Sequence, residues 1–302
     1  APPARILLTD SGSQAIDLVF RLLIEPGAAV LVDDPCYFNF LGMARAHRAR
    51  LVGVPMTPSG PDLAAFAAAA AAHRPQLYLT TAALHNPTGA SLTPATAHGL
   101  LKLAELNDIV VVEDDIFGDL EPDPAAPRLA ALDGLARVIQ VGSFSKTLSA
   151  AARCGFVAAR ADWIEALTDL KLATTFGNGD LSARLVHALL TDGSYRRHVA
   201  GLRTRLARAM GETARQLGAA GLRLWTEPRG GLFLWAELPE GLDSAEVARR
   251  AMAEGVVFAP GNVFSLSQAA GRFLRFNVAQ SGHPRVFDVL RRMADGAAAA
   301  AT

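Results

Sequence analysis

The most informative stretch of the sequence is Arg137-Val-Ile-Gln-Val-Gly-Ser-Phe-Ser-Lys-Thr-Leu-Ser-Ala-Ala-Ala-Arg-Cys-Gly-Phe156. Val138, Ile139 and Val141 form a short apolar run, as in a buried strand, and Gly142 ends it. A loop at the end of this strand therefore contains the polar residues Ser143, Ser145, Lys146 and Arg153. Loops held by rigid strands are where binding and catalytic residues concentrate.

The chain has three lysines, and their surroundings differ. Lys102 and Lys171 each lie in an amphipathic helical pattern, where a solvated surface lysine is expected. Lys146 instead has a loop setting with glycine and hydroxyl neighbours. Because arginine stays protonated and cannot attack a carbonyl group, an amine nucleophile must be one of these three. We predict that Lys146 is the reactive amine.

Composition excludes several classes of protein. With 302 residues, 51% of them hydrophobic, the chain can bury a large core in one large or two closely joined domains. Its net charge is zero and no run of basic residues occurs, so this chain offers no electrostatic footprint for nucleic acid or membrane. The two cysteines, Cys36 and Cys154, lack metal-ligand spacing and are expected to be buried thiols in a cytoplasmic protein. No histidine pair has the spacing of a metal site.

Strand and helix patterns alternate through the first part of the chain. We expect strands over 5–9, 29–32, 51–54, 76–81, 109–112, 138–141 and 155–159, and helices over 14–23, 40–47, 62–72, 94–106, 162–174 and 181–191. This alternation predicts an α/β fold whose large domain, 1–190, has a mostly parallel sheet flanked by helices. The remainder, 191–302, predicts a smaller α+β domain with strands over 222–225, 232–237, 256–259 and 273–278 and helices over 195–217, 243–253 and 284–294.

Polar clusters follow the predicted strands at their carboxyl ends, where ligands bind in such sheets. They are Ser11-Gly12-Ser13, His85-Asn86-Pro87, Asp114-Asp115 and Ser143 to Lys146. The first of them precedes a helix, so its backbone N–H groups could hold an anion; an ordinary helix cap is the alternative. We expect the four clusters to converge on one crevice.

Other chemistries fit this pattern less well. Ser143-x-x-Lys146 has the spacing of serine β-lactamases, but their companion Ser-Asp-Asn and Lys-Thr-Gly elements do not occur. A G-x-S-x-G elbow and a P-loop are also absent from the sequence. A lysine, an anion cup, an acid at a strand end and an aromatic residue are instead the parts that pyridoxal 5'-phosphate requires.

With these residues the chain resembles the fold-type I pyridoxal-phosphate enzymes of aminotransferase class I/II over essentially its whole length. By that resemblance Lys146 forms the Schiff base with the cofactor, and Ser11, Gly12, Ser13, Ser143, Ser145 and Arg153 hold its phosphate. The resemblance also implies that Asp114 pairs with the ring nitrogen, Asn86 contacts the ring oxygen and the substrate, and Tyr37 stacks on the ring. Arg275 would bind the substrate carboxylate. For Tyr37 a simple core role is the alternative, and His85 would only orient Asn86.

Two departures from the family are visible. Three residues past Asp114 the family has a tyrosine that donates to the ring oxygen, and Phe117 occupies that place here. We therefore expect altered cofactor titration and slower chemistry. By the resemblance, a segment that closes over the substrate precedes the strand at Arg5, and we expect this chain to be without it.

Within the family, residues 113–120, 193–203 and 228–235 look most like the aminotransferase-like domain of MocR-type regulators in the GntR group. They are also similar to aromatic and aminoadipate aminotransferases. The first hypothesis is an aminotransferase acting on an amino acid and a 2-oxo acid, as a homodimer. The second is an effector-sensing, weakly catalytic or non-catalytic domain of a transcriptional regulator, in which DNA contact would lie in a segment outside this chain.

Overall fold

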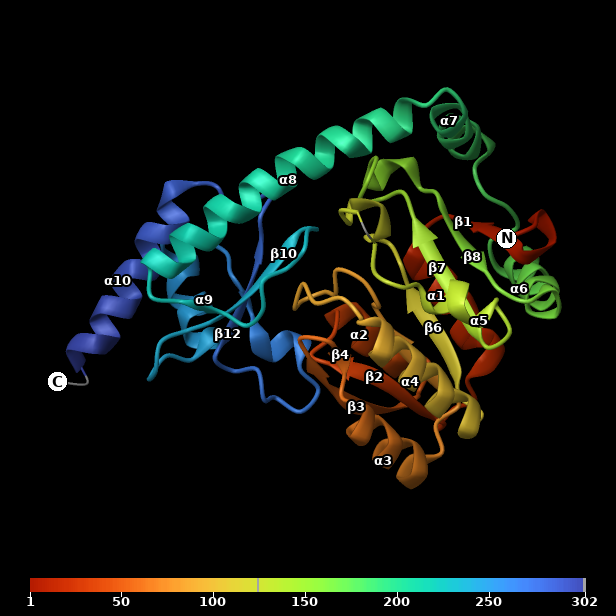
Figure 1. The fold of residues 1–302 in the computed structure, drawn as a ribbon, viewed down its shortest axis with the longest axis horizontal. Coiled ribbons are helices and arrows are strands. Elements are labelled where there is room, and N and C mark those ends of the chain that lie inside the picture. The colour runs from red at the N-terminus through yellow and green to blue at the C-terminus, as the bar shows by residue number, and fades with distance from the viewer. Residues whose placement is uncertain (124, 301–302) are drawn as a thin grey trace.

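The fold is built around a large, mostly parallel sheet. The computed structural model describes residues 1–123 and 125–300, and within them eight strands pair in the order β1-β8-β7-β6-β5-β2-β3-β4 (Figure 1). The strands are β1 (Ile6–Thr9), β2 (Ala29–Asp34), β3 (Arg50–Thr57), β4 (Gly60–Pro61), β5 (Leu77–Thr80), β6 (Val110–Asp114), β7 (Val138–Ser143) and β8 (Gly155–Ala158). Strand β8 runs antiparallel to both of its neighbours, and β4 is antiparallel to β3. The central run from β7 to β3 is parallel.

Helices cover both faces of this sheet. One face packs against α1 (Gly12–Leu23), α2 (Phe38–Ala46) and α6 (Ala161–Thr174), and the other against α3 (Leu63–His73), α4 (Pro94–Leu106) and α5 (Leu129–Asp133). Successive residues of β5 alternate between the two cores, with Leu77 and Leu79 on the first side and Tyr78 on the second. Burial on both faces explains why these strands are short, nearly continuous apolar runs.

The second sheet is smaller and antiparallel. Among the described residues it contains four strands in the order β11-β12-β10-β9. They are β9 (Arg223–Leu224), β10 (Phe233–Glu237), β11 (Ala259–Pro260) and β12 (Phe273–Asn277), accompanied by α9 (Ser244–Ala253) and α10 (Pro284–Ala300). Short 3-10 helices occur at η1 (Pro3–Arg5), η2 (Gly118–Leu120), η3 (Ala150–Ala152) and η4 (Gly261–Phe264).

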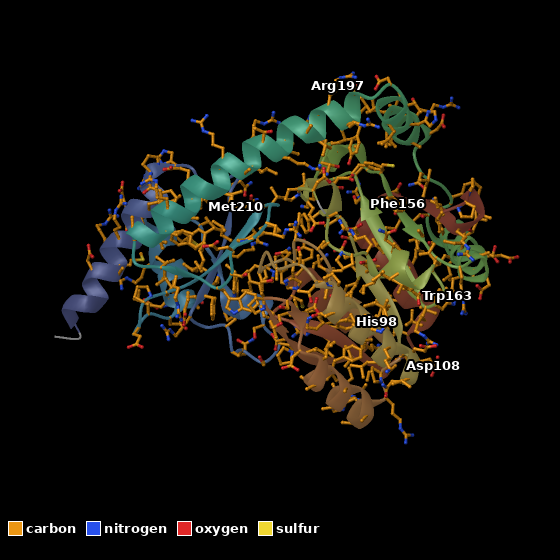
Figure 2. All side chains as sticks on the ribbon, viewed as in Figure 1. His98, Asp108, Phe156, Trp163, Arg197 and Met210 are labelled. Carbon is orange, nitrogen blue, oxygen red and sulfur yellow. The ribbon has the colours of Figure 1, made fainter. Side chains whose placement is uncertain are left out.

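A single long helix joins the two sheets. After α7 (Asp180–Thr191), α8 (Ser194–Ala219) runs for 26 residues from the side of the large sheet to the small sheet (Figure 1). Arg197 lies near its first turn, whereas Met210, further along, faces the small-sheet core (Figure 2). Both Met210 and Leu217 belong to that core. The helix therefore contacts both parts of the molecule.

The predicted fold class is confirmed: a mostly parallel α/β sheet is followed by a smaller antiparallel sheet with helices. The helix over 94–106 has the predicted bounds because Thr93 caps it and Pro94 occupies its first turn. The strand expected over 256–259 is only Ala259–Pro260 in the structure. The domain division near residue 190 stays a prediction.

The prediction that Lys171 is a solvated surface lysine was wrong. Lys171 is 6% exposed, and its ammonium group donates a hydrogen bond to the Leu8 carbonyl at 2.8 Å and another to Asn178 Oδ1. The helix pattern hid this role because the acceptors come from β1 and from the loop after α6. Lys102 is exposed as predicted, and both cysteines are buried free thiols as predicted.

Candidate active site

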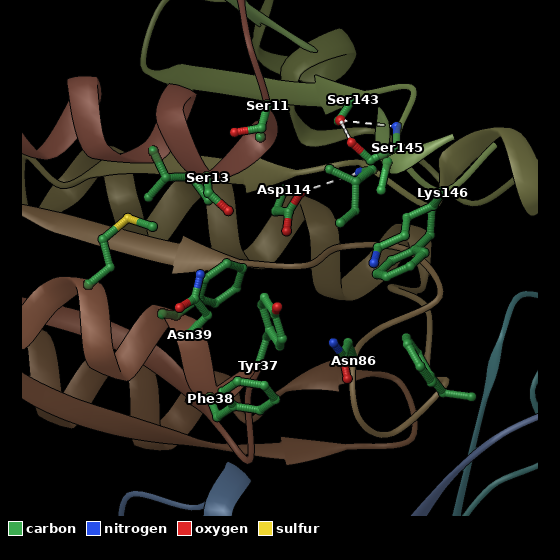
Figure 3. A pocket seen from close by; sticks show the side chains of 18 of the residues that line it. Ser11, Ser13, Tyr37, Phe38, Asn39, Asn86, Asp114, Ser143, Ser145 and Lys146 are labelled. Carbon is green, nitrogen blue, oxygen red and sulfur yellow. Dashed lines mark hydrogen bonds between the residues drawn. The ribbon is translucent and has the colours of Figure 1, made fainter. Parts of the chain in front are cut away.

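A single cavity of about 410 Å³ lies where the strands of the large sheet end. All the residues singled out in the sequence for cofactor or substrate line it: Ser11, Gly12, Ser13, Tyr37, Asn86, Asp114, Phe117, Ser143, Ser145, Lys146, Arg153 and Arg275. In Figure 3 the side chains of Tyr37, Asn86, Asp114 and Lys146 turn toward the same space. The structure thus brings the four predicted clusters together, while their individual roles stay predictions.

Three consecutive acids lie at the end of β6 and just after it, and their side chains have different partners. Glu113 accepts hydrogen bonds from the backbone N–H groups of Leu129 at 2.8 Å and Ala130 at 2.9 Å, which caps α5. Asp115 lies 2.8 Å from Arg128 and accepts a hydrogen bond from Gln140 at 2.9 Å. Asp114 points the other way, as strand alternation requires, and lines the cavity.

Asp114 is held in an environment that disfavours its charge. The side chain is 3% exposed, and burial raises its pKa to about 7. The nearby carboxylates of Asp115 and Glu113 push the pKa in the same direction, while a hydrogen bond from the Ile116 N–H and the charge of Lys146 oppose the rise. A cationic N–H group placed in the cavity would restore the charged carboxylate, because an opposite charge lowers the pKa of an acid.

Lys146 is the lysine that lines this cavity among the residues that the structure describes. It sits in a turn after β7, exposed to solvent, and its charge acts on Asp114. Lys102 lies on the surface of α4, and the Lys171 ammonium group is hydrogen-bonded to Leu8 and Asn178. Lys146 as the reactive amine stays a prediction.

The end of the cavity near α1 is rich in hydrogen-bond donors. Ser11 caps α1, its hydroxyl accepting from the Gln14 N–H at 3.1 Å, so the ordinary cap expected as an alternative does form. The first N–H groups of a helix have no acceptor within the helix and remain available to an anion. Ser143 and Ser145 share a hydrogen bond of 3.0 Å, and both line the cavity with Arg153. This donor set fits a phosphate group.

Backbone packing keeps this end narrow. A Cβ on Gly155 would lie 2.9 Å from both the Ser11 carbonyl carbon and the Gly142 oxygen, and a Cβ on Gly12 would lie 3.2 Å from Ile116. The start of α1 therefore presses directly on β8, and this contact fixes the serines opposite the loop of Lys146.

Arg275 reaches the cavity from the small sheet. Its Nη1 donates a hydrogen bond to Asn86 Oδ1 at 2.9 Å, and its guanidinium lies 4.6 Å from the Phe233 ring and 4.8 Å from the Phe264 ring. Burial lowers its pKa, and its Nε is buried without a hydrogen-bond partner in the described structure. Within the described residues Arg275 has no carboxylate partner, and a cation held between two rings is suited to bind a carboxylate from solution.

A buried polar network supports the loops that carry Tyr37 and Asn86. Asp33, at the end of β2, accepts hydrogen bonds from the hydroxyl groups of Tyr78 and, at 2.9 Å, Thr80. His85 Nε2 lies 3.2 Å from the Asp33 carboxylate, and His85 Nδ1 lies 2.8 Å from the Thr88 hydroxyl. His85 is buried among these groups, and its role in orienting Asn86 stays a prediction.

Some residues around the cavity were not predicted from the sequence. Phe233, Phe264, Asp33 and Tyr78 belong to strands or loops that read as ordinary core. Asp33 carried a usable signal, since an acid that ends a buried strand needs hydrogen-bond donors. The sequence around Phe264 gave no such signal, because the contact of Phe264 with Arg275 depends on how η4 packs against β12.

In the described part of the chain no helix is both long and apolar enough to span a membrane. The same residues contain no group of three histidine, cysteine or acidic side chains that could hold a metal ion.

Comparison with known proteins gives a consistent picture. Residues 1–291 match the family model described as aminotransferase class I and II. The chain is 33% identical to 2-aminoadipate transaminase of Thermus thermophilus over 96% of this chain and 75% of that protein. It is 28% identical to an uncharacterized HTH-type transcriptional regulator of Bacillus subtilis, YdfD, over 91% of this chain and only 57% of the regulator. The crystal structure of α-aminoadipate aminotransferase LysN from T. thermophilus, complexed with N-(5'-phosphopyridoxyl)-L-leucine, superposes with a TM-score of 0.90 at 30% identity, covering 99% of this chain and 79% of that one.

Proposed function

This chain belongs to the aminotransferase class I and II family, and we propose that it transfers an amino group between an amino acid and a 2-oxo acid with pyridoxal 5'-phosphate bound in the cavity. The observation that carries the proposal is the convergence of one lysine amine, one buried carboxyl and one anion-binding helix start on a single cavity. Each comes from a different strand end. The family resemblance noted in the sequence is confirmed at this level.

The residues present fit this cofactor. When bound, pyridoxal 5'-phosphate supplies an aldehyde carbon and an electron-withdrawing ring. The start of α1, Ser143, Ser145 and Arg153 would hold the phosphate, and Tyr37 would lie against the ring face. Asp114 would hold the proton of the ring nitrogen, which offsets the cost of burying its carboxylate.

Lys146 has two tasks in this proposal. Its Nζ would hold the aldehyde carbon of the cofactor, and the same Nζ would accept the proton from the substrate α-carbon. The exposed turn that carries Lys146 leaves its amine room for both positions.

Arg275 and Asn86 orient the substrate. The Arg275 guanidinium can bind the α-carboxylate in a two-point arrangement, which fixes the direction of the α-carbon relative to Lys146. Because Asn86 Oδ1 accepts from Arg275, its amide nitrogen is left to donate toward the cavity. The rings of Phe233 and Phe264 hold water away from the guanidinium.

The proposed assembly is a homodimer. Helix α7 and the residues before it expose large apolar side chains, with Phe176 80% and Leu181 83% exposed. Exposed apolar groups of this size favour a protein partner. Sedimentation velocity at several protein concentrations tests the dimer directly, and a monomer at all concentrations contradicts it.

A second candidate function has two supporting observations. The chain matches HTH-type transcriptional regulators, and Phe117 stands where a hydroxyl donor is expected in the aminotransferases. In that case the cavity binds the cofactor and an amino acid as an effector, with little or no turnover. The whole regulator would need further chain, since this one spans 57% of YdfD.

Two measurements test the proposed function. Borohydride reduction of the loaded protein followed by peptide mass spectrometry should place the cofactor on Lys146, and Lys146→Ala should abolish the adduct while Lys102→Arg retains it. A single-turnover assay should then detect one equivalent of 2-oxo acid per cofactor. An adduct at Lys146 without any 2-oxo acid favours the effector-binding domain, and an adduct at another lysine refutes both assignments.

A further inference from the structure

The first turns of α8 contact two of the loops that form the cavity. Tyr195, in the first turn, shares a hydrogen bond of 2.9 Å with the hydroxyl of Thr147, the residue directly after Lys146. The Tyr195 hydroxyl also donates to the carboxylate of Asp119, which follows Phe117 by two positions. Its ring packs edge-on against Phe144, with ring centroids 5.6 Å apart.

The hydrogen-bond directions follow from the donors available. Tyr195 has one hydroxyl proton, and the Asp119 carboxylate can only accept. The Tyr195 proton therefore goes to Asp119, and the Thr147 hydroxyl donates to the Tyr195 oxygen. Burial and the Asp119 carboxylate both raise the pKa of Tyr195, so it stays protonated and able to donate over the usual pH range.

Two further contacts hold backbone atoms of the same loops. His198 Nε2 lies 2.8 Å from the Thr147 carbonyl oxygen, which can only accept, so the imidazole donates there. Arg203 Nε donates to the Asp119 carbonyl at 2.8 Å. Thr147 is 2% exposed and is thus held through both its side chain and its backbone by one helix face.

We infer that Tyr195 and His198 are positioning residues that fix the Lys146 loop against α8, and this inference rests on the proposed role of Lys146. The same helix packs its later residues, Leu206, Met210 and Leu217, into the core of the small sheet that carries Arg275. Helix α8 is thus a rigid link between the residue that binds the substrate carboxylate and the residue that moves the proton.

The contacts of Tyr195 and His198 with Thr147 are called the clamp below. Hydrogen exchange in the cofactor-free protein tests whether the clamp holds the Lys146 loop, and this measurement needs no turnover. The Leu148 amide donates to the Phe144 carbonyl at 2.8 Å within the loop and reports its opening. Losing one clamp hydrogen bond should speed exchange of residues 144–149 by about two- to tenfold. Amides of β5 (Leu77–Thr80) serve as a reference in the same sample.

The variants are chosen to keep the fold. Tyr195→Phe removes the hydroxyl but keeps the ring on Phe144, and His198→Leu removes the donor to Thr147. His198→Gln retains an N–H donor and should restore slow exchange. Arg196→Gln, an exposed neighbour on the same turn, is the matched control and should match the wild type.

The outcomes are decisive in each direction. Faster exchange confined to residues 144–149, with recovery in His198→Gln, supports the clamp. Exchange within twofold of wild type in both Tyr195→Phe and His198→Leu overturns it, as does an equal increase in the β5 reference. If the wild type turns over amino acids, Tyr195→Phe should lower kcat about three- to tenfold with KM within twofold, because Arg275 is untouched. If the wild type does not turn over, the proposed catalysis fails while the exchange experiment still decides the clamp.

Discussion

Arg275 and Asn86 are 189 positions apart in the sequence, and a hydrogen bond of 2.9 Å joins them across the cavity. Arg275 belongs to the small sheet, and Asn86 belongs to a loop of the large sheet. The proposed carboxylate-binding group is therefore aligned by a residue from the cofactor side. The residues proposed for the substrate and for the cofactor are thus in direct contact.

Replacement of Arg275 by lysine should weaken substrate binding selectively. Arg275→Lys loses the planar, two-point donor arrangement and the contact with Asn86, so kcat/KM for amino acids should fall roughly 10- to 100-fold, chiefly through KM. Cofactor affinity, measured by fluorescence titration, should stay within twofold. An unchanged KM contradicts the assignment of Arg275 to the substrate carboxylate. Arg205→Lys, at an exposed position of α8, is the control.

Replacement of Asp114 by asparagine should change how the stability of the cofactor-free protein depends on pH. The Asp114 pKa is about 7 in the folded protein, above its ordinary value of 3.8, so folding favours the neutral acid. Stability should therefore fall as pH rises from about 4 to 7, and Asp114→Asn should lack this loss. The stability of the variant relative to wild type, from urea unfolding, should rise by about 2–3 kcal/mol between pH 5 and pH 8. A difference that is independent of pH removes this account.

Introducing a hydroxyl at position 117 should change the pH at which the bound cofactor titrates. Phe117 is 2% exposed, lines the cavity and packs edge-on against Phe233 with ring centroids 5.4 Å apart. Phe117→Tyr would place a donor where the family's tyrosine is expected, stabilising the ionised ring oxygen. The pH titration of the bound cofactor's absorbance should then shift to lower pH, and turnover should rise. An unchanged titration curve shows that position 117 does not govern the ring oxygen.

The buried network around Asp33 should contribute measurably to stability. Tyr78→Phe removes one donor to a carboxylate that is 1% exposed, which should cost about 1–3 kcal/mol of unfolding free energy. Tyr37→Phe makes the same chemical change at a half-buried side chain on the cavity wall and should cost under about 0.5 kcal/mol. Equal effects of the two substitutions, measured by urea unfolding, argue against a special role for the network.

Much of the architecture was predictable because burial leaves a simple pattern. The strands that end at Thr80, Asp114 and Ser143 are mostly apolar and are followed by polar residues, so both the sheet and the side of it that carries the cavity could be predicted. The short helix α5 was missed. Its cap is the carboxylate of Glu113, 16 residues earlier, and no local pattern contains that partner.

The contacts that depend on strand register or on the second sheet could not be predicted. Tyr78 reaches Asp33 because β2 and β5 pair in parallel with Leu31 beside Tyr78. Lys171 looked like a surface residue because the helical pattern does not show that the Leu8 carbonyl lies beside it. The ring contacts of Arg275 likewise require η4 and β10 to be folded together.

The length of α8 is itself constrained by what it joins. Each residue of a helix adds about 1.5 Å of rise and about 100° of rotation, and both attachments lie within the 26 residues of α8. Deleting one residue from its middle would turn the small sheet by more than a quarter of a circle relative to the Lys146 loop. Arg275 would then face away from the cavity even though every side chain that lines it had been kept.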